Sequence, residues 1–136
     1  MALAVSGAKL SVDEIARRYD VSRNHLAKVS QRLLAEGYIE TFRGRAGGMR
    51  LAREPSEIVV GQVVRRFENF DAFVSCFPSG SGCAVNGVCA LKLALGGALE
   101  AFFAHLDRYR VSDLIPDQAA FASRLKLITE ERKPLQ

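Results

Sequence analysis

Residues 11–29, SVDEIARRYDVSRNHLAKV, carry the pattern of two short helices separated by a tight turn. Ser11 and Glu14 have the spacing of a capping box, in which each side chain bonds the backbone N–H of the other residue. This pattern predicts a helix that starts at Ser11 and ends near Tyr19-Asp20. On that helix two apolar residues would face the core and two arginines would stay in water: Ile15, Ala16, Arg17 and Arg18.

A second and longer helix is predicted directly after the turn. Ser22 is an N-cap candidate, and Gly37 is placed to end the helix because glycine readily adopts the left-handed conformation found there. Between them, apolar residues recur at the spacing of one helical face: Leu26, Val29, Leu33 and Leu34. The opposite face is left to polar residues: Arg23, Asn24, Lys28 and Arg32.

Two short candidate strands follow, over residues 38–42 and 49–52. Aromatic and β-branched residues enrich the first strand, and the glycine-rich segment 43–48, RGRAGG, suits a hairpin turn between the two. A short helix, a turn, a longer helix and a basic hairpin follow one another in the order of a winged helix-turn-helix. The expected fold class is therefore mainly α with a small β-hairpin wing.

The second half of the chain is predicted to contain two more helices. Residues 58–67 would bury four side chains: Val59, Val63, Val64 and Phe67. After a glycine- and serine-rich loop over 71–88, a long helix should run from residue 89 or 90 to about 109. Its apolar face is too wide for one small domain to cover, which predicts a homodimer. The residues expected to make this dimer interface are Leu91, Leu95, Leu99, Phe102, Phe103 and Leu106.

These elements suggest four regions. The expected ranges are a winged helix-turn-helix domain at 1–68, a cysteine-bearing loop at 69–89, a dimerisation helix region at 90–116 and a C-terminal tail at 117–136. The tail is charged and is expected to be partly helical.

The charge distribution points to an anionic partner for the first half of the chain. The net charge of the 136 residues is +4, but residues 1–66 hold 12 Lys and Arg against 7 Asp and Glu, a net +5. In a helix-turn-helix the second helix reads bases in the major groove, and a basic wing suits a narrow minor groove. The predicted DNA-binding residues are Ser22, Arg23, Asn24, His25, Lys28, Arg43, Arg45 and Arg50.

Three cysteines, Cys76, Cys83 and Cys89, form a C-x6-C-x5-C pattern. Structural zinc sites more often have close cysteine pairs and four protein ligands, whereas iron–sulfur clusters accept looser spacings and a non-cysteine ligand. Three reduced thiols without a cofactor are the third alternative, and the spacing alone does not separate these readings.

Several other classes find little support. No Cys/His pair suits a hydrolase, no phosphate-binding glycine motif is present, and His25 and His105 are expected to be surface or packing residues, so no enzyme is predicted. The first ten residues do not form a targeting signal, and charged residues interrupt the most apolar stretch, 89–106. We therefore expect a cytoplasmic protein without a membrane span.

Segments 21–29 (VSRNHLAKV), 33–39 and 43–52 (RGRAGGMRLA) closely resemble the Rrf2 family of bacterial transcription regulators. The cysteines, the following segment 91–95 (LKLAL) and residues 111–115 (VSDLI) also match. The resemblance covers about residues 1–116. Within the family, it is strongest to the branch that senses nitric oxide.

The resemblance implies a homodimer that represses promoters by binding double-stranded DNA. It also implies an iron–sulfur cluster, of the 4Fe–4S or 2Fe–2S type, on Cys76, Cys83 and Cys89. In family members nitric oxide nitrosylates the cluster and releases the DNA. A sensor of iron, cluster status or redox state within the same family is the alternative, ahead of a zinc-binding or thiol-redox protein.

The sequence departs from the family pattern at its start. Family members begin with a further first helix, which in some of them supplies an acidic fourth cluster ligand from the partner subunit. No residue of this chain matches that ligand, so we expect the chain to hold its cluster poorly and to purify as apo-protein. Lys92 stands where a sister branch has a histidine ligand, which argues against that type of site.

Overall fold

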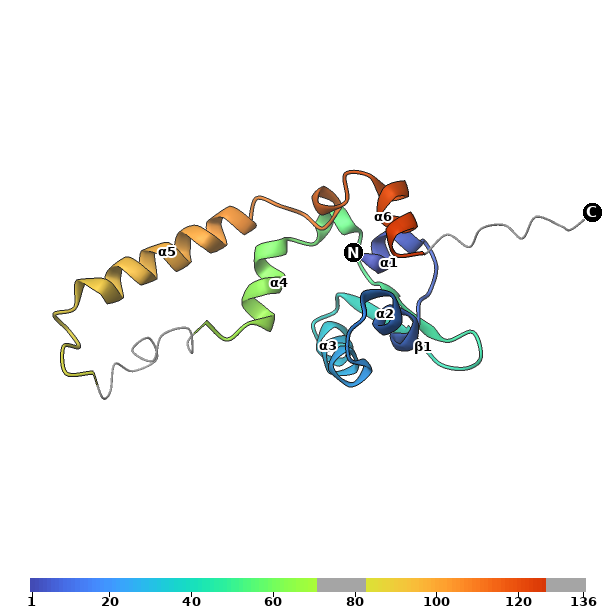
Figure 1. Ribbon diagram of the computed structural model, residues 1–136, viewed down its shortest axis with the longest axis horizontal. Helices are drawn as coiled ribbons and strands as arrows, with labels where there is room; N and C mark the ends of the chain where they lie inside the picture. The colour runs from blue at the N-terminus through green and yellow to red at the C-terminus, as the bar shows by residue number, and fades with distance from the viewer. Residues whose placement is uncertain (71–82, 127–136) are drawn as a thin grey trace, which may run out of the picture. The chain divides into compact units, whose positions relative to one another are not determined.

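The computed structural model describes residues 1–70 and 83–126, which are mainly helical with one antiparallel hairpin (Figure 1). The elements are α1 (Ala2–Ser6), α2 (Val12–Tyr19), α3 (Arg23–Ala35), β1 (Ile39–Phe42), β2 (Gly48–Leu51), η1 (Pro55–Glu57), α4 (Val60–Phe67), α5 (Ala90–Leu106), η3 (Ser112–Leu114) and α6 (Gln118–Arg124). They form two compact units, a first unit of Met1–Glu57 with Val111–Gln136 and a second unit of Ile58–Arg110. The boundaries between the units, after residues 57 and 110, differ from those of the expected regions, which fall after residues 68, 89 and 116.

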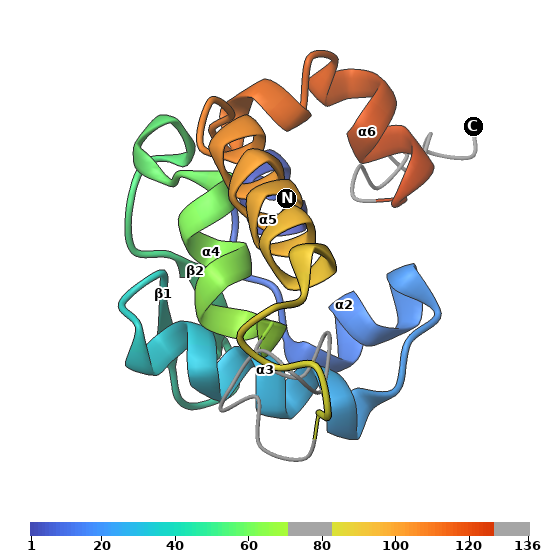
Figure 2. The ribbon, with the colours of Figure 1, turned by 90° about the vertical axis from the view of Figure 1, so that its left-hand side faces the viewer.

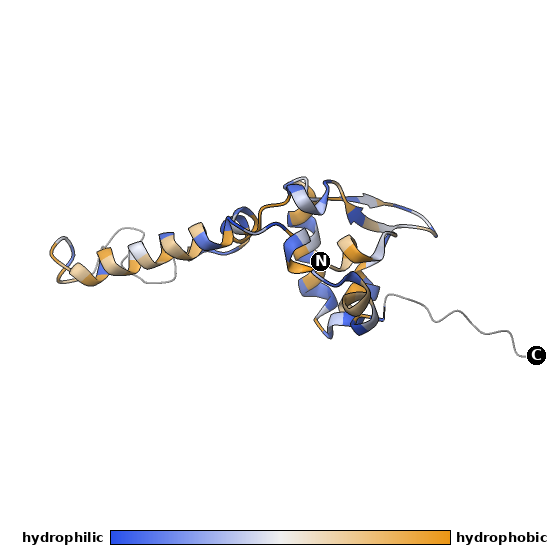
Figure 3. Ribbon diagram, turned by 90° about the horizontal axis from the view of Figure 1, so that it is seen from above, coloured by the Kyte–Doolittle hydropathy of each residue, from blue (hydrophilic) through white to orange (hydrophobic). Residues whose placement is uncertain are grey.

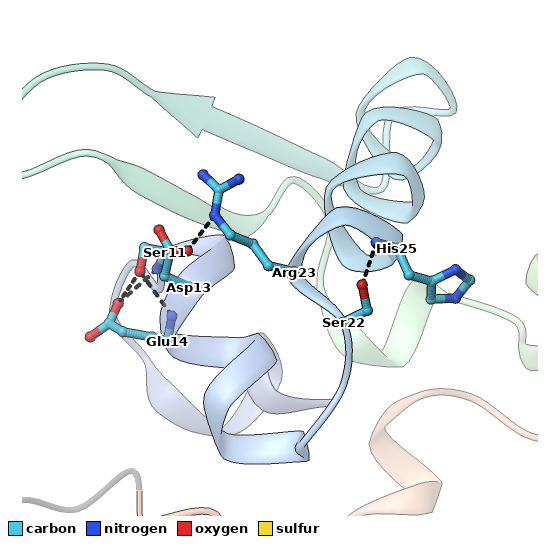
Figure 4. A network of polar contacts seen from close by, with 6 residues as sticks. All are labelled: Ser11, Asp13, Glu14, Ser22, Arg23 and His25. Atoms are coloured by element: carbon cyan, nitrogen blue, oxygen red, sulfur yellow. Dashed lines mark hydrogen bonds and ion pairs between the residues drawn. The ribbon is translucent and has the colours of Figure 1, made fainter.

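The start of α2 is fixed by the predicted capping box (Figure 4). The backbone N–H of Ser11 donates to Glu14 Oε2 at 2.8 Å, and the backbone N–H of Glu14 donates to Ser11 Oγ at 3.1 Å. The first of these bonds is the main reason why the pKa of Glu14 lies below its usual value. Ile15 and Ala16 are buried, as the pattern predicts.

Arg18, at the end of α2, does not stay in water as expected. Its Nη1 donates to the carbonyl oxygen of Leu125 at 2.9 Å and also contacts that of Lys126. Arg17 is exposed, as predicted. The last turn of α2 is therefore tied to the end of α6, a contact between residues that lie far apart in the sequence.

The boundaries of α3 agree with the sequence, but its buried face does not fully agree. Ser22 caps the first turn, and Gly37 follows the helix with a φ of +70°. Leu34, predicted to be on the apolar face, is 43% exposed, and Ser30 is buried. The Ser30 hydroxyl donates to the carbonyl of Leu26 at 2.8 Å, so burial leaves no unpaired polar group there.

The hairpin pairs β1 with β2 in the register Ile39 to Leu51 and Phe42 to Gly48. β1 begins one residue after its predicted start, and β2 begins one residue before. Gly47 makes the turn possible, because a Cβ atom there would lie 2.6 Å from the carbonyl oxygen of Phe42. Leu10 adds a short antiparallel bridge to Met49 on the other edge of β2.

The core of the first unit joins residues from both ends of the chain. Side chains from the N-terminal helices and the hairpin are buried together with two side chains from the C-terminal region. These two are Ile115, directly after η3, and Ala122 in α6. These core residues are Ala2, Leu10, Ile15, Ala16, Tyr38, Ile39, Met49, Ile115 and Ala122. The charged C-terminal region thus contributes a helix to this unit, in line with the partial helicity that we expected.

The second unit is built on the packing of α4 beside α5 (Figure 2). The backbone N–H of Val60 donates to the carbonyl of Tyr109 at 3.0 Å, and Val59 forms an isolated bridge with Arg110. α4 begins two residues later than predicted, and α5 ends three residues earlier, where turns follow it at residues 107 and 108. Among the described residues no helix is both long and apolar enough to span a membrane.

Four residues form what we call the Asp107 clamp: Gly61, Arg65, Phe103 and Asp107. Arg65 Nη1 and Nη2 donate to the two carboxylate oxygens of Asp107 at 2.6 and 2.7 Å. A Cβ atom on Gly61 would stand 2.1 Å from Asp107 Oδ1, so only glycine lets the carboxylate come so near to α4. The Arg65 guanidinium lies 4.3 Å from the Phe103 ring centre. The four side chains predicted to face inward from this segment are each only half-buried, whereas Gly61 is buried.

Candidate nucleic-acid interface and cysteine segment

The start of α3 presents the residues that the sequence assigns to base recognition. Ser22 Oγ accepts a hydrogen bond from the backbone N–H of His25 at 3.4 Å, which orders the first turn (Figure 4). The side chains that follow are exposed: Arg23, Asn24, His25 and Lys28. The helix-turn-helix geometry therefore leaves this end of α3 free to enter a groove.

An ion pair connects α3 to α2. Arg23 Nε donates to Asp13 Oδ1 at 2.5 Å, with both side chains nearly two-thirds exposed (Figure 4). Exposed pairs of this kind contribute little stability. This pair instead orients the Arg23 side chain. Asp13 accepts a hydrogen bond only from Nε, so the two outer guanidinium nitrogens of Arg23 can still donate to a further acceptor.

The hairpin carries three of the arginines predicted to bind DNA, two in the turn and one in an ion pair on the strands. Arg43 and Arg45 are exposed in the turn between the strands. Arg50 is also exposed, but it pairs with Glu40 on the neighbouring strand and lies 5.1 Å from the Phe42 ring centre. Arg43 and Arg45 thus suit insertion into a groove, whereas Arg50 is held along the sheet surface.

Lys9 is a cation at the wing that sequence reasoning missed. Its Nζ lies 4.0 Å from the centre of the Phe42 ring, within range of a cation–π interaction. The two backbone hydrogen bonds between Leu10 and Met49, 3.0 and 2.8 Å long, bring it there. No local pattern could have indicated this, since pairing across about forty residues of sequence is a tertiary event.

Two of the three cysteines lie in the described part of the chain. Cys83 is exposed and Cys89 half-buried, and neither forms a disulfide; Cys76 lies outside the described residues. Two successive turns connect the pair, with hydrogen bonds from Asn86 N–H to the Cys83 carbonyl and from Val88 N–H to the Val85 carbonyl.

The two free thiols of Cys83 and Cys89 are ligands that suit a soft metal centre. Cys89 occupies the N-cap position of α5 and lines a cavity of about 370 Å³ together with residues 86–88, Ala90, Lys92 and Leu93. Within residues 1–70 and 83–126 no group of three potential metal ligands comes together. Free thiols are the ligand type that iron–sulfur clusters use.

The two histidines lie on the surface, as expected. His25 and His105 are both exposed, and the His105 ring lies 5.3 Å from that of Tyr109. His105 belongs to the far end of α5 from Cys89, so it does not join the cysteine segment.

The predicted dimer face of α5 is only partly available to a partner. Phe103 is 6% exposed and packs edge-on against Phe70 at 4.8 Å within its own chain, which corrects its assignment to an intermolecular surface. Leu91 and Phe102 are 63% and 46% exposed. A cavity of about 380 Å³ on this helix is lined entirely by apolar residues: Phe70, Leu95, Ala98, Leu99 and Phe102. The ribbon of α5 is apolar along most of its length (Figure 3).

Comparison with known proteins gives matches along most of the chain. Residues 1–117 match the family Rrf2, described as an iron-dependent transcriptional regulator. The chain is 46% identical over 119 residues to the HTH-type transcriptional regulator NsrR of Geobacillus kaustophilus (strain HTA426), covering 87% of this chain and 81% of that protein. It is 41% identical over 122 residues to NsrR of Bacillus subtilis (strain 168), with coverages of 89% and 84%.

Solved structures support the same fold. T. potens IscR matches with a TM-score of 0.66 at 22% identity, covering 88% of this chain and 81% of that one. CymR (YrzC), the global cysteine regulator of B. subtilis, matches with a TM-score of 0.62 at 24% identity and coverages of 82% and 83%. At these identities the likeness establishes the winged helix-turn-helix fold, as predicted, and no more.

Proposed function

The chain belongs to the Rrf2 family of transcriptional regulators, and from this premise we propose that it is a nitric-oxide-responsive repressor. In this proposal two chains bind promoter DNA through α3 and the wing, and an iron–sulfur cluster on Cys76, Cys83 and Cys89 reports nitric oxide. The family is one of regulators, not of enzymes. The observation that carries the proposal is the similarity of most of the chain to NsrR proteins.

The contact with DNA follows from the chemistry of the exposed side chains. Arginine can form a paired hydrogen bond with guanine and asparagine with adenine, so Arg23 and Asn24 suit direct reading of bases. Ser22 and Lys28 suit phosphate contacts, which set the register on the duplex. Arg43 and Arg45 suit the narrow minor groove, where the negative potential is enhanced.

The response to nitric oxide rests on the cysteine segment and on the nitric-oxide-sensing branch that the sequence resembles. Bound to the three thiolates, an iron–sulfur cluster would supply iron that reacts with nitric oxide. Cys89 is directly joined to α5, whose far end is held to α4 by the Asp107 clamp. A change at Cys89 would therefore act directly on the first turn of α5.

Cysteine replacement tests the sensing proposal. Because the chain is expected to purify as apo-protein, it is first reconstituted with iron and sulfide in the absence of oxygen. The reconstituted protein is expected to show broad visible absorption from sulfur-to-iron charge transfer, and Ser at Cys76, Cys83 or Cys89 should abolish it, because a serine hydroxyl is a poor substitute for a thiolate ligand. Operator affinity, measured by fluorescence anisotropy, should fall at least tenfold together with the absorption.

His105→Asn is the control, since this exposed residue lies outside the cysteine segment and should leave colour and affinity unchanged. A colourless wild type that contains zinc would reject the sensing proposal. So would a triple Cys→Ser variant that binds DNA tightly and still releases it on exposure to nitric oxide. Release by an iron chelator but not by nitric oxide would favour the iron sensor, in keeping with the description of the family as iron-dependent.

The homodimer is proposed from the uncovered apolar side of α5. Leu91→Glu is expected to weaken dimerisation at least about 100-fold, because each of the two copies loses the burial of a leucine, worth about 1.5–3 kcal/mol. In the single chain Leu91 is 63% exposed and lies in the first turn of α5, where a carboxylate does not harm the helix. Sedimentation velocity over a range of concentrations measures the change.

Leu93→Glu is the matched control. Leu93 is in the same turn and is 79% exposed, but it lies on the side of α5 that carries Glu100, away from Leu91. This variant should dimerise like the wild type. A wild-type chain that sediments as a monomer at micromolar concentration would reject the homodimer.

A further inference from the structure

We propose that a basic pocket between α2 and α6 binds a phosphate of the DNA backbone and so extends the DNA contact beyond α3 and the wing. The pocket has a volume of about 390 Å³ and is lined by Arg17, Arg18, Arg124, Leu125 and Lys126. We call it the α2–α6 pocket. The inference rests on the proposed DNA-binding function, but none of the residues predicted to bind DNA lies in this pocket.

Arg18 holds the pocket together. Its Nη1 is bonded to the carbonyl oxygens of Leu125 and Lys126, which α6 leaves without helical partners at its end. Its Nε is buried and has no hydrogen-bond partner among the described residues. Arg18 thus lines the base of the pocket and joins α2 to the end of α6.

The other three cations of the pocket are not used in ion pairs within the described residues. Arg17, Arg124 and Lys126 are exposed, and none of them forms a salt bridge within the described residues. Glu14 acts on Arg17 and Arg18 through its charge, but its carboxylate is already bonded to Ser11.

Stabilisation of helix ends is the alternative explanation for these charges. The C-terminal end of a helix carries about half a negative charge, so α2 and α6 together offer about one. Four cations line the pocket, against these two helix ends and the carboxylates of Glu14 and of Asp20, the C-cap residue of α2. The remaining positive charge in a concave surface favours an anion from outside.

The position of α2 favours DNA as the source of that anion. α2 is the first helix of the helix-turn-helix, the one that crosses the phosphate backbone in such motifs. Arg17 lies in its last turn, shortly before the N-cap of α3 at Ser22. The three cations at the rim are exposed and long, which suits a polyanion more than an enclosed small ligand.

The dependence of DNA binding on salt tests this proposal. Each phosphate contact that is lost should reduce the slope of log K against log salt concentration by about 0.9. Arg124→Gln should therefore lower the slope, and Arg17→Gln/Arg124→Gln should lower it further. Operator and non-operator duplexes of equal length should lose affinity by the same factor, because a phosphate carries no sequence information. Fluorescence anisotropy at several salt concentrations provides all these values.

Arg108→Gln is the matched control, since it removes an equal charge from an exposed arginine in the second unit and should leave the slope near that of the wild type. Unchanged thermal unfolding would show that the variants fold. An unchanged slope in the double variant overturns the inference. If the wild type then binds inorganic phosphate in a calorimetric titration and the double variant does not, the pocket takes a free anion instead. A wild type that binds no DNA would overturn the proposed function as well.

Discussion

An Arg23→Ala/Asn24→Ala/Arg45→Ala variant is expected to bind a cognate promoter about 1,000-fold more weakly than the wild type. Each paired hydrogen bond between a side chain and a base is worth about 1–3 kcal/mol, and a dimer loses two copies of each. Even at the lower end, Arg23 and Asn24 account for about 4 kcal/mol, or nearly three powers of ten. Electrophoretic mobility shift or fluorescence anisotropy on the promoter fragment measures this loss.

The single substitutions distinguish the two parts of the interface. Arg23→Ala and Asn24→Ala should relax the preference for particular base pairs, whereas Arg45→Ala should weaken binding with less effect on the choice of sequence. Asp13→Asn is the control for Arg23, because it removes the ion pair and keeps the guanidinium. It should retain most of the affinity. Equal affinities of the wild type and the triple variant would reject the site.

Gly61→Ala is expected to destabilise the protein by about 2–3 kcal/mol, although alanine is the better helix former. The new Cβ atom would lie 2.1 Å from Asp107 Oδ1 and 2.9 Å from the Asp107 backbone nitrogen. The carboxylate can move only by giving up its bonds with Arg65, and the backbone contact would persist. The midpoint of chemical unfolding, followed by circular dichroism, measures the change.

Gly97→Ala is the matched control, for which we expect a gain in stability instead of a loss. Gly97 is an exposed position inside α5 where a Cβ atom meets nothing within 4 Å, so alanine should stabilise the helix by about 0.5–1 kcal/mol. A Gly61→Ala variant that is as stable as the Gly97→Ala variant would show that the clamp tolerates the extra carbon.

The stability that the Asp107 clamp contributes is expected to depend on pH. Hydrogen bonding to Arg65 lowers the pKa of Asp107 below its ordinary value of 3.8. A carboxyl group with a lowered pKa stabilises the folded state above its unfolded pKa, and this contribution is lost as the pH falls through the folded value. The stability difference between the wild type and Asp107→Asn should therefore be constant near neutral pH and shrink under acidic conditions. A difference that does not change with acidification would contradict the role of the ion pair.

Most of the helix-turn-helix could be predicted from the sequence because its signals are local. The bonds between Ser11 and Glu14 and between Ser22 and His25 each join residues three positions apart. Gly37 and the apolar spacing of α3 likewise act within a few turns of one helix. The base-reading residues could be named for the same reason, since their exposure follows from the face of the helix that carries them.

The errors occur where one segment meets another that is distant in the sequence. Arg18 was expected in water, yet its partner on α6 is 107 residues away. Phe103 was assigned to a partner chain, yet Phe70 and Arg65 of its own chain cover it. Helical periodicity shows that a face is apolar, but it does not say which neighbour will cover that face.

By itself the sequence determined the order of the α-helices and strands from α2 to α5, the helix-turn-helix, the basic wing and the family, whereas it did not predict α1. These features depend on the spacing of residue types within a few turns, where the backbone brings partners together automatically. Only the tertiary structure decided that Lys9 joins the wing, that Asp107 closes on Gly61 and that the end of α6 meets Arg18. Such contacts join residues far apart in the chain, and the packing of the whole core, rather than any local pattern, selects them.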